Sequence, residues 1–313
     1  MNIILANPRG FCAGVDRAID ITNKALDIFG APIYVKHEIV HNKYVVEELK
    51  DKGVIFIEEI SKVPEHSILI YSAHGVSEEI IKESKDRKLK IFNATCPLVT
   101  KVHMEVARLS KNNINTILIG HKGHPEVEGT IGRYISESDS KIILVENEDD
   151  INKLNFDADK KVAYVTQTTL SIDDTSNIIK IIKNKYKNVI EPSRGDICYA
   201  TTNRQNAVKD LTKKCDIIFV VGSENSSNSN RLKEISTRSG VPSYLLDCAD
   251  DLDVKWLLNK KNIGLTAGAS APEVLVQSII NKLKGYGAIN VINSTGVEES
   301  ITFKIPKELV IKS

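Results

Sequence analysis

Three cysteines lie at similar places in the chain and suggest a shared site. Cys12, Cys96 and Cys198 each follow a short apolar stretch and precede an amphipathic one, so each is expected where a strand leads into a helix. In an open α/β sheet, ligands bind outside the carboxyl ends of the strands. Thiolates select zinc, copper(I) or iron–sulfur clusters, and three of them leave one position open on either a four-iron cluster or a zinc ion.

The other two cysteines, Cys215 and Cys248, lie beside apolar strand-like stretches and are expected to be buried and inert. An odd number of widely spaced cysteines argues against a disulfide framework. The sequence has no C-x-x-C pair, which excludes a local zinc ribbon or ferredoxin-type motif. Any metal site must therefore be assembled from distant parts of the chain.

Polar residues recur at similar distances after the three cysteines. A first set lies 29, 28 and 28 residues on (41 − 12, 124 − 96, 226 − 198): His41, His124 and Ser226. A second set lies 62, 72 and 72 residues on (74 − 12, 168 − 96, 270 − 198): His74, Thr168 and Ser270. This agreement predicts a threefold pseudo-repeat with residues 1–12 and the tail after Gly285 outside the repeat itself. The predicted units are residues 1–96 (with the N-terminal strand and Cys12), 97–194, 195–285 and a tail, 286–313, that packs back on the core.

Several of these loops combine hydroxyls, histidines and small residues at the starts of predicted helices. Free N–H groups at a helix N-terminus bind anions, most often phosphate. Because no Walker A or G-x-G-x-x-G pattern occurs, a nucleotide is not indicated. A small, highly charged anion such as diphosphate fits these loops better.

Glu126 and Glu128 share the histidine-containing loop of residues 120–129. In an apolar pocket beside a metal, one of these carboxylates can act as a proton donor. Pro125 should fix the direction of the next residue, which favours Glu126. The alternative is a surface carboxylate at the start of a helix.

Strand and helix patterns alternate along all 313 residues and indicate an α/β fold with largely parallel sheets. A net charge of +1 gives no support for binding nucleic acid or a membrane surface. No apolar run approaches the ~20 residues of a spanning helix, and the first strand leaves no room for a signal peptide, so we expect a cytoplasmic protein. Strands are expected at residues 3–6, 33–35, 68–71, 91–94, 116–119, 162–165, 217–221 and 263–266.

Eight segments, spread over nearly the whole chain, carry a family resemblance. They are residues 6–15, 73–77, 94–103, 123–129, 166–169, 198–205, 225–230 and 266–270. Two of them are ten residues long, Ala-Asn-Pro-Arg-Gly-Phe-Cys-Ala-Gly-Val and Ala-Thr-Cys-Pro-Leu-Val-Thr-Lys-Val-His. These segments resemble the 4-hydroxy-3-methylbut-2-enyl diphosphate reductase family.

The resemblance implies three pseudo-equivalent α/β units in a trefoil around a central iron–sulfur cluster. It implies reductive removal of the hydroxyl of (E)-4-hydroxy-3-methylbut-2-enyl diphosphate to give isopentenyl and dimethylallyl diphosphate, the last step of the non-mevalonate isoprenoid pathway. Cys12, Cys96 and Cys198 would hold a [4Fe-4S] cluster whose open iron binds the substrate hydroxyl, and Glu126 would deliver protons. The residues implied to bind the substrate, with Thr168 also ordering the proton relay, are His41, His74, His124, Thr168, Ser226, Ser227, Asn228 and Ser270.

The two electrons must come from outside, because the chain has no flavin or nicotinamide motif. In the family that the sequence resembles, the donor is flavodoxin or reduced ferredoxin, and an acidic partner of this kind implies a local Lys/Arg patch near the cluster. Two other functions stay open at this point. An iron–sulfur hydratase needs no reductant, whereas a cluster-bearing electron carrier or diphosphate sensor needs no carboxylate in its pocket.

The cysteines are expected to differ in their effect on the cofactor. Replacing Cys12, Cys96 or Cys198 by serine should abolish a stable cluster, because each removes a thiolate ligand. Cys215→Ser and Cys248→Ser are the matched controls and should retain it. Iron and sulfide analysis after anaerobic purification measures the outcome, and a cluster lost only with Cys215 or Cys248 would identify a different set of ligands.

Overall fold

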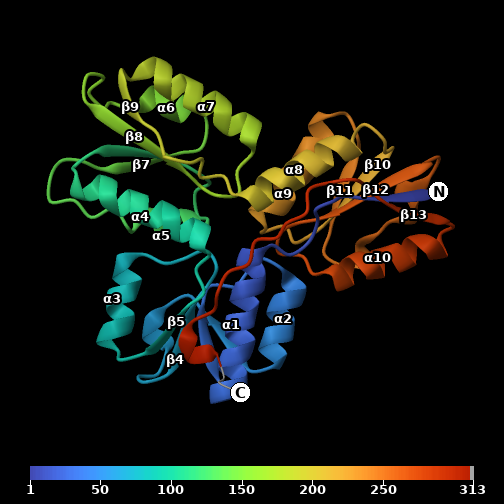
Figure 1. Cartoon of the computed structure of the whole chain (residues 1–313), viewed down its shortest axis with the longest axis horizontal. Coiled ribbons are helices and arrows are strands. Elements are labelled where there is room, and N and C mark those ends of the chain that lie inside the picture. Colours follow the sequence, from blue (N-terminus) through green and yellow to red (C-terminus); the bar gives the residue numbers. More distant parts are fainter. Residues whose placement is uncertain (311–313) are drawn as a thin grey trace. The chain divides into compact units, whose positions relative to one another are not determined.

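A computed structural model describes residues 1–310, which fold as two compact units (Figure 1). The first compact unit comprises Met1–Asp16, Val40–Glu48 and Tyr199–Thr302. The second comprises Arg17–Ile39, Leu49–Cys198 and the residues from Phe303 on. Each is described by itself below.

The first compact unit is built on a parallel five-stranded sheet in the order β11-β10-β12-β1-β13. Its strands are β1 (Asn2–Leu5), β10 (Ile217–Val221), β11 (Ser243–Leu246), β12 (Asn262–Ala267) and β13 (Asn290–Asn293). Its helices are α8 (Tyr199–Leu211) and α9 (Ser227–Arg238) on one face, and α10 (Glu273–Gly285) on the other (Figure 1). Apolar side chains of β10 alternate between two cores, one under each set of helices, whereas those of β12 (Ile263, Leu265 and Ala267) all belong to the core with α10.

The second compact unit contains two parallel four-stranded sheets, in the orders β3-β2-β4-β5 and β7-β6-β8-β9. The strands of the first sheet are β2 (Ile33–Lys36), β3 (Val54–Ile57), β4 (Ile68–Tyr71) and β5 (Lys90–Asn93). Those of the second are β6 (Asn115–Ile119), β7 (Ile142–Val145), β8 (Lys161–Thr166) and β9 (Asn188–Ile190).

The helix α1 (Ala13–Phe29) follows β1 and precedes β2. The helices that follow strands of the two four-stranded sheets are α2 (Lys43–Asp51), α3 (Glu78–Asp86), α4 (Pro97–Lys111), α5 (Pro125–Ile131), α6 (Glu148–Lys153) and α7 (Ile172–Lys185). The first residues of α1 and of α2 belong to the first compact unit. Figure 1 shows α4 and α5 on one face of the β6–β9 sheet and α6 and α7 on the other. Short 3-10 helices span Ile60–Lys62, Ala249–Asp251, Val254–Leu257 and Lys307–Leu309.

The predicted α/β class with parallel sheets is confirmed, and every predicted strand is present to within a residue or so. The three sheets share one order: the strand before a cysteine (β1, β5 or β9) pairs with the strand before a second polar loop (β12, β4 or β8). The strand β1 lies between β12 and β13, in the sheet of the C-terminal third of the chain. Where each predicted unit begins and ends, near residues 96, 195 and 285, stays a prediction.

No helix within residues 1–310 combines the length and the apolar character that a membrane span requires. Cytoplasmic location stays a prediction.

Gly264 on β12 tests the packing of the first compact unit. A Cβ atom at this position would lie 2.8 Å from Ile218 Cγ1 and 3.1 Å from Cys215 Sγ. Gly264→Ala should therefore lower the free energy of unfolding by about 1–3 kcal/mol, the usual cost of overpacking. Gly285→Ala is the control, because nothing lies within 4 Å of its Cβ position. Thermal unfolding of both variants under anaerobic conditions measures the effect, and equal midpoints would contradict it.

Candidate functional site

The predicted site residues are divided between the two compact units. The first contains Cys12, His41, Ser226, Ser227, Asn228 and Ser270. The second contains His74, Cys96, His124, Glu126, Thr168 and Cys198.

Cys12 lies at the end of the loop that follows β1, directly before α1. Its N–H donates to the carbonyl oxygen of Ala269 at 3.2 Å, and the N–H of Gly10 donates to Ala267 at 3.1 Å. These bonds continue the β1–β12 pairing beyond the strands. Gly10 has a φ of 71°, a left-handed conformation that glycine adopts without strain.

The start of α9 provides the polar groups of the first compact unit. Ser226 is the N-cap, and its Oγ accepts the N–H of Ser229 at 3.3 Å. Ser227 is the first helical residue, and the Oδ1 of Asn228 accepts the N–H of Ala269 at 2.9 Å. Within the described chain, Asn228 Nδ2 is buried without a hydrogen-bond partner. A helix N-terminus with a donor left over is suited to an anionic ligand.

Ser270 and His41 are joined in the same unit. Ser270 Oγ donates to the backbone carbonyl of His41 at 2.8 Å, and this bond links the loop after β12 to the segment before α2. Asn225 Nδ2 lies 3.4 Å from His41 Nδ1. The structure therefore brings Cys12, His41, Asn228 and Ser270 into one bonded group through Ala269 and its neighbours.

His74 and His124 meet in the second compact unit. Their rings are 5.7 Å apart in an edge-to-face arrangement. His124 is the N-cap of α5, and its Nδ1 accepts the N–H of Glu126 at 3.1 Å, which leaves Nε2 to carry the proton of the neutral ring. The loop of Gly75 can lie this close to α5 because residue 129 is a glycine: a Cβ atom there would be only 3.2 Å from the carbonyl oxygen of Gly75.

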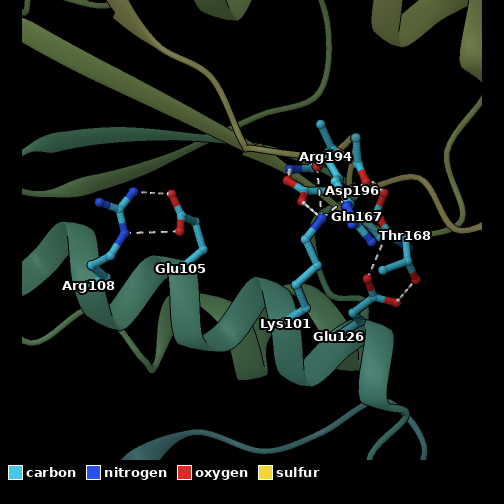
Figure 2. A network of polar contacts seen from close by, with 10 residues as sticks. Lys101, Glu105, Arg108, Glu126, Gln167, Thr168, Arg194 and Asp196 are labelled. Carbon is cyan, nitrogen blue, oxygen red and sulfur yellow. Dashed lines mark hydrogen bonds and ion pairs between the residues drawn. The ribbon is translucent and has the colours of Figure 1, made fainter.

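Glu126 is almost fully buried, with 4% of its surface exposed, whereas Glu128 is exposed. The N–H of Thr168 donates to Oε1 at 2.6 Å, and the Thr168 hydroxyl donates to Oε2 at 2.9 Å (Figure 2). Burial raises the pKa of Glu126 to about 7; the two Thr168 bonds oppose this rise, and the charge of Asp196 adds to it. A carboxyl group with this pKa can donate a proton near neutrality and take one back. Its burial excludes the surface-carboxylate alternative.

Cys96 and Cys198 make the same kind of backbone hydrogen bond as Cys12. Cys96 is the N-cap of α4, and its N–H donates to the carbonyl oxygen of Ala73 at 3.0 Å. Cys198 directly precedes α8, and its N–H donates to Thr168 at 3.0 Å. In each case the acceptor belongs to the loop after the neighbouring parallel strand.

The donor chemistry of these thiols fits an iron–sulfur cofactor. None of the three forms a disulfide, all are half-buried, and each lies at a helix N-terminus. Burial raises the pKa of Cys12, while hydrogen bonds from the N–H groups of Val15 and Gly14 and the charge of Arg204 oppose the rise. Backbone N–H groups directed at sulfur stabilise a thiolate ligand. Among residues 1–310, no compact group of three or more His, Cys, Asp or Glu side chains has the arrangement of a metal site.

The two other cysteines differ from each other. Cys215 is buried in the core formed with α8 and α9, as expected, and burial raises the pKa of its thiol to about 12. Cys248 is exposed at the start of a 3-10 helix, so the expectation that it is buried is wrong. An apolar run before a cysteine predicts a strand, but it does not predict whether a thiol just after that strand is buried or exposed.

Asp196 is a further candidate residue, which the sequence did not indicate and whose charge acts on Glu126. Its side chain is fully buried, and its Oδ2 accepts the N–H of Thr166 at 3.1 Å. Lys101 lies 3.3 Å from its Oδ1 (Figure 2). Its place two residues before Cys198 is the only signal in the sequence that could have pointed to it.

Comparison with known proteins identifies close relatives over the full length of the chain. The family described as "LytB protein" matches residues 3–284. The curated 4-hydroxy-3-methylbut-2-enyl diphosphate reductase of Actinobacillus succinogenes is 58% identical over 311 residues, and that of Saccharophagus degradans is 57% identical over 309 residues. Each of these alignments covers 99% of this chain and 99% of the relative.

Two solved structures are also similar. The E-1-hydroxy-2-methyl-but-2-enyl-4-diphosphate reductase from Plasmodium falciparum superposes with a TM-score of 0.93 at 44% identity, covering 99% of this chain and 96% of that one. A structure of (E)-4-hydroxy-3-methyl-but-2-enyl diphosphate reductase, described as the terminal enzyme of the non-mevalonate pathway, gives a TM-score of 0.65 at 32% identity and covers 91% of this chain. The fold predicted from the motifs is therefore confirmed.

The raised pKa of Glu126 makes stability depend on pH. The pKa is about 7 in the folded chain against an ordinary value of 4.5, so the folded state holds the proton more tightly. The protonated carboxyl group therefore stabilises the folded state fully at pH values below the pKa of the unfolded chain, and this stabilisation is lost as the pH rises through about 7. Relative to Glu126→Gln, the wild type should lose about 3 kcal/mol of unfolding free energy as the pH rises from below 4.5 to above 7. Denaturant unfolding at several pH values measures the difference, and Glu128→Gln should follow the wild type. Parallel curves for Glu126→Gln and wild type would contradict the prediction.

Proposed function

Because this chain belongs to the LytB protein family and is a reductase like its curated relatives, we propose that it reduces an allylic diphosphate. The substrate is (E)-4-hydroxy-3-methylbut-2-enyl diphosphate, and the products are isopentenyl and dimethylallyl diphosphate. The overall change consumes two electrons and two protons: the C–O bond to the hydroxyl breaks, one proton leaves with the hydroxyl as water, and the other is added to carbon. The reaction is the last step of the non-mevalonate isoprenoid pathway.

The observation that carries this proposal is the buried Glu126 held by Thr168. Hydroxide is a poor leaving group, so the C–O bond breaks readily only when a proton is delivered to its oxygen. With its pKa raised to about 7 by burial, Glu126 is available as the acid at neutral pH. The Thr168 hydroxyl fixes the carboxyl group and orders the proton relay.

Family membership implies an iron–sulfur cofactor, and we assign to it a [4Fe-4S] cluster held by Cys12, Cys96 and Cys198. The support is chemical: three cysteines outside any disulfide, each at a strand-to-helix junction and each followed by helix N–H groups. When bound, such a cluster supplies the route for the two electrons and a Lewis-acidic iron for the substrate hydroxyl. The electrons come from an external carrier, flavodoxin or ferredoxin, for which a basic patch stays a prediction.

The diphosphate group is bound by neutral donors and histidines. Asn228 Nδ2, buried without a partner among the described residues, is a donor that a phosphate oxygen would satisfy. The N-terminus of α9, with Ser226 and Ser227, adds N–H groups and hydroxyls. The other groups assigned to the substrate are His41, His74, His124 and Ser270.

Turnover of an anaerobically purified holoenzyme with a chemical reductant tests the proposal. Glu126→Gln should lower turnover by about 10²-fold or more while leaving iron, sulfide and diphosphate affinity unchanged, because it removes only the proton donor. Glu128→Gln is the matched control from the same loop and should retain activity. Comparable turnover in Glu126→Gln would rule out its role as donor.

The same assay separates the other two functions. Product formation without any reductant would indicate a hydratase. Unchanged substrate under reducing conditions, with the cluster intact, would indicate an electron carrier or a sensor.

A further inference from the structure

A lysine on the helix after Cys96 binds the segment before Cys198. Lys101 lies five residues after Cys96 (101 − 96), on α4. Its Nζ donates to the carbonyl oxygens of Arg194 at 2.8 Å and Gly195 at 3.2 Å. Figure 2 shows this lysine reaching from α4 to the chain segment of Arg194 and Asp196. The helix that begins at one thiol therefore fixes the approach to another.

An arginine on the helix after Cys12 makes the corresponding contact with the loop before Cys96. Arg17 lies five residues after Cys12 (17 − 12), on α1. Its Nη1 donates to the carbonyl oxygen of Thr95 at 3.1 Å, and its Nη2 donates to that of Asn93 at 3.1 Å. Its Nε donates to the carbonyl oxygen of Lys304 at 2.8 Å.

An arginine on the helix after Cys198 completes the pattern at the loop before Cys12. Arg204 lies six residues after Cys198 (204 − 198), on α8, and is fully buried at 0% exposure. Its Nη2 donates to the carbonyl oxygens of Gly10 at 2.7 Å and Phe11 at 3.1 Å, and its Nε also donates to Gly10 at 3.0 Å. Its Nη1 lies 3.1 Å from Oε1 of Glu299.

These contacts have a cyclic order along the chain. In each case a basic side chain from the second turn of the helix after one cysteine binds carbonyl oxygens within four residues before the next cysteine. A carbonyl oxygen is neutral, so these bonds orient each cation without themselves cancelling its charge, and a charged donor makes the bond stronger than an amide would. Lys101 and Arg204 are in addition paired with the carboxylates of Asp196 and Glu299. Arg204 and Cys12 interact electrostatically, as do Arg17 and Cys96, which places two of the cations near sulfur.

We propose that Arg17, Lys101 and Arg204 are positioning residues that act as a set. Arg17 holds the segment before Cys96, Lys101 holds the segment before Cys198, and Arg204 holds the segment before Cys12. This inference rests on the proposed role of the three thiols as ligands of one cofactor. Fixing a loop at its carbonyl oxygens leaves the adjacent thiol and its helix N–H groups free to face the cofactor. Arg204 near Cys12 and Arg17 near Cys96 also offset part of the negative charge that thiolates and sulfide bring to the site.

A merely structural role predicts a different result from this cyclic one. If each basic residue only stabilised its own helix, its loss would loosen the cysteine at the start of that helix. The cyclic role predicts that the loosened segment belongs to the next cysteine, which is 79 residues away from Arg17 and 97 from Lys101 (96 − 17 and 198 − 101).

Hydrogen exchange of the anaerobic holoenzyme, read by mass spectrometry, distinguishes the two. Arg17→Gln should speed amide exchange about tenfold in residues 93–96, and Lys101→Gln should do so in residues 194–198, because an opening made easier by about 1.4 kcal/mol exchanges ten times faster. Arg204→Lys, which keeps the buried charge but loses the fork of donors, should affect residues 9–12. Release of iron to a chelator should be faster in all three variants.

Conservative replacements and a neighbouring cation serve as controls. Lys101→Arg should restore much of the protection, since it keeps a charged donor at the same place, whereas Arg17→Lys, like Arg204→Lys, loses the fork of donors and should restore less. Arg108→Gln lies two turns further along α4, where Arg108 pairs with Glu105, and should leave residues 194–198 and iron release unchanged.

Two outcomes overturn the proposal: faster exchange at the cysteine of the mutated residue's own helix, or an equal effect of Arg108→Gln. Exchange and iron release do not require turnover. A protein that fails as a reductase but shows the cyclic pattern would therefore retain this inference and lose only the proposed function.

Discussion

A backbone hydrogen bond from each cysteine to the loop beside it is the constraint on which the candidate site depends. Cys12, Cys96 and Cys198 each donate their N–H to a carbonyl oxygen just beyond the end of the neighbouring parallel strand. The bond is possible only because the two strands run in the same direction and end at the same edge of their sheet. Through this bond, the loop that carries each cysteine continues the strand pairing of its sheet.

Thr168 shows how closely the acid and one thiol are connected. Its N–H and hydroxyl hold the two oxygens of Glu126, and its carbonyl oxygen accepts the N–H of Cys198. Desolvation is the larger influence on Glu126, so the bonds from Thr168 limit the rise of its pKa without reversing it. One threonine therefore fixes the position of the acid relative to the segment that carries a thiol, and it also limits the rise of the acid's pKa.

Much of this arrangement could be predicted from the sequence, because apolar runs report burial and the cysteines stand at the ends of such runs. The partners of β1 could not be predicted, since a local apolar pattern does not say which strand lies beside it. The strand β13 was not predicted because its residues are exposed and show no apolar alternation. Arg17, Lys101 and Arg204 were not recognised, because a basic residue on a helix resembles a solvated one and its acceptors are carbonyl oxygens, which every residue has.

The position of β1 between β12 and β13 has a consequence for synthesis of the chain. The β2–β5 and β6–β9 sheets are each made from one continuous stretch, so each can pair as soon as that stretch has left the ribosome. The first strand made, in contrast, pairs with residues 262–265 and 290–293, among the last to be made. The loop of Cys12 therefore acquires its backbone partner, Ala269, only near the end of translation, after the loops of Cys96 and Cys198 have acquired theirs.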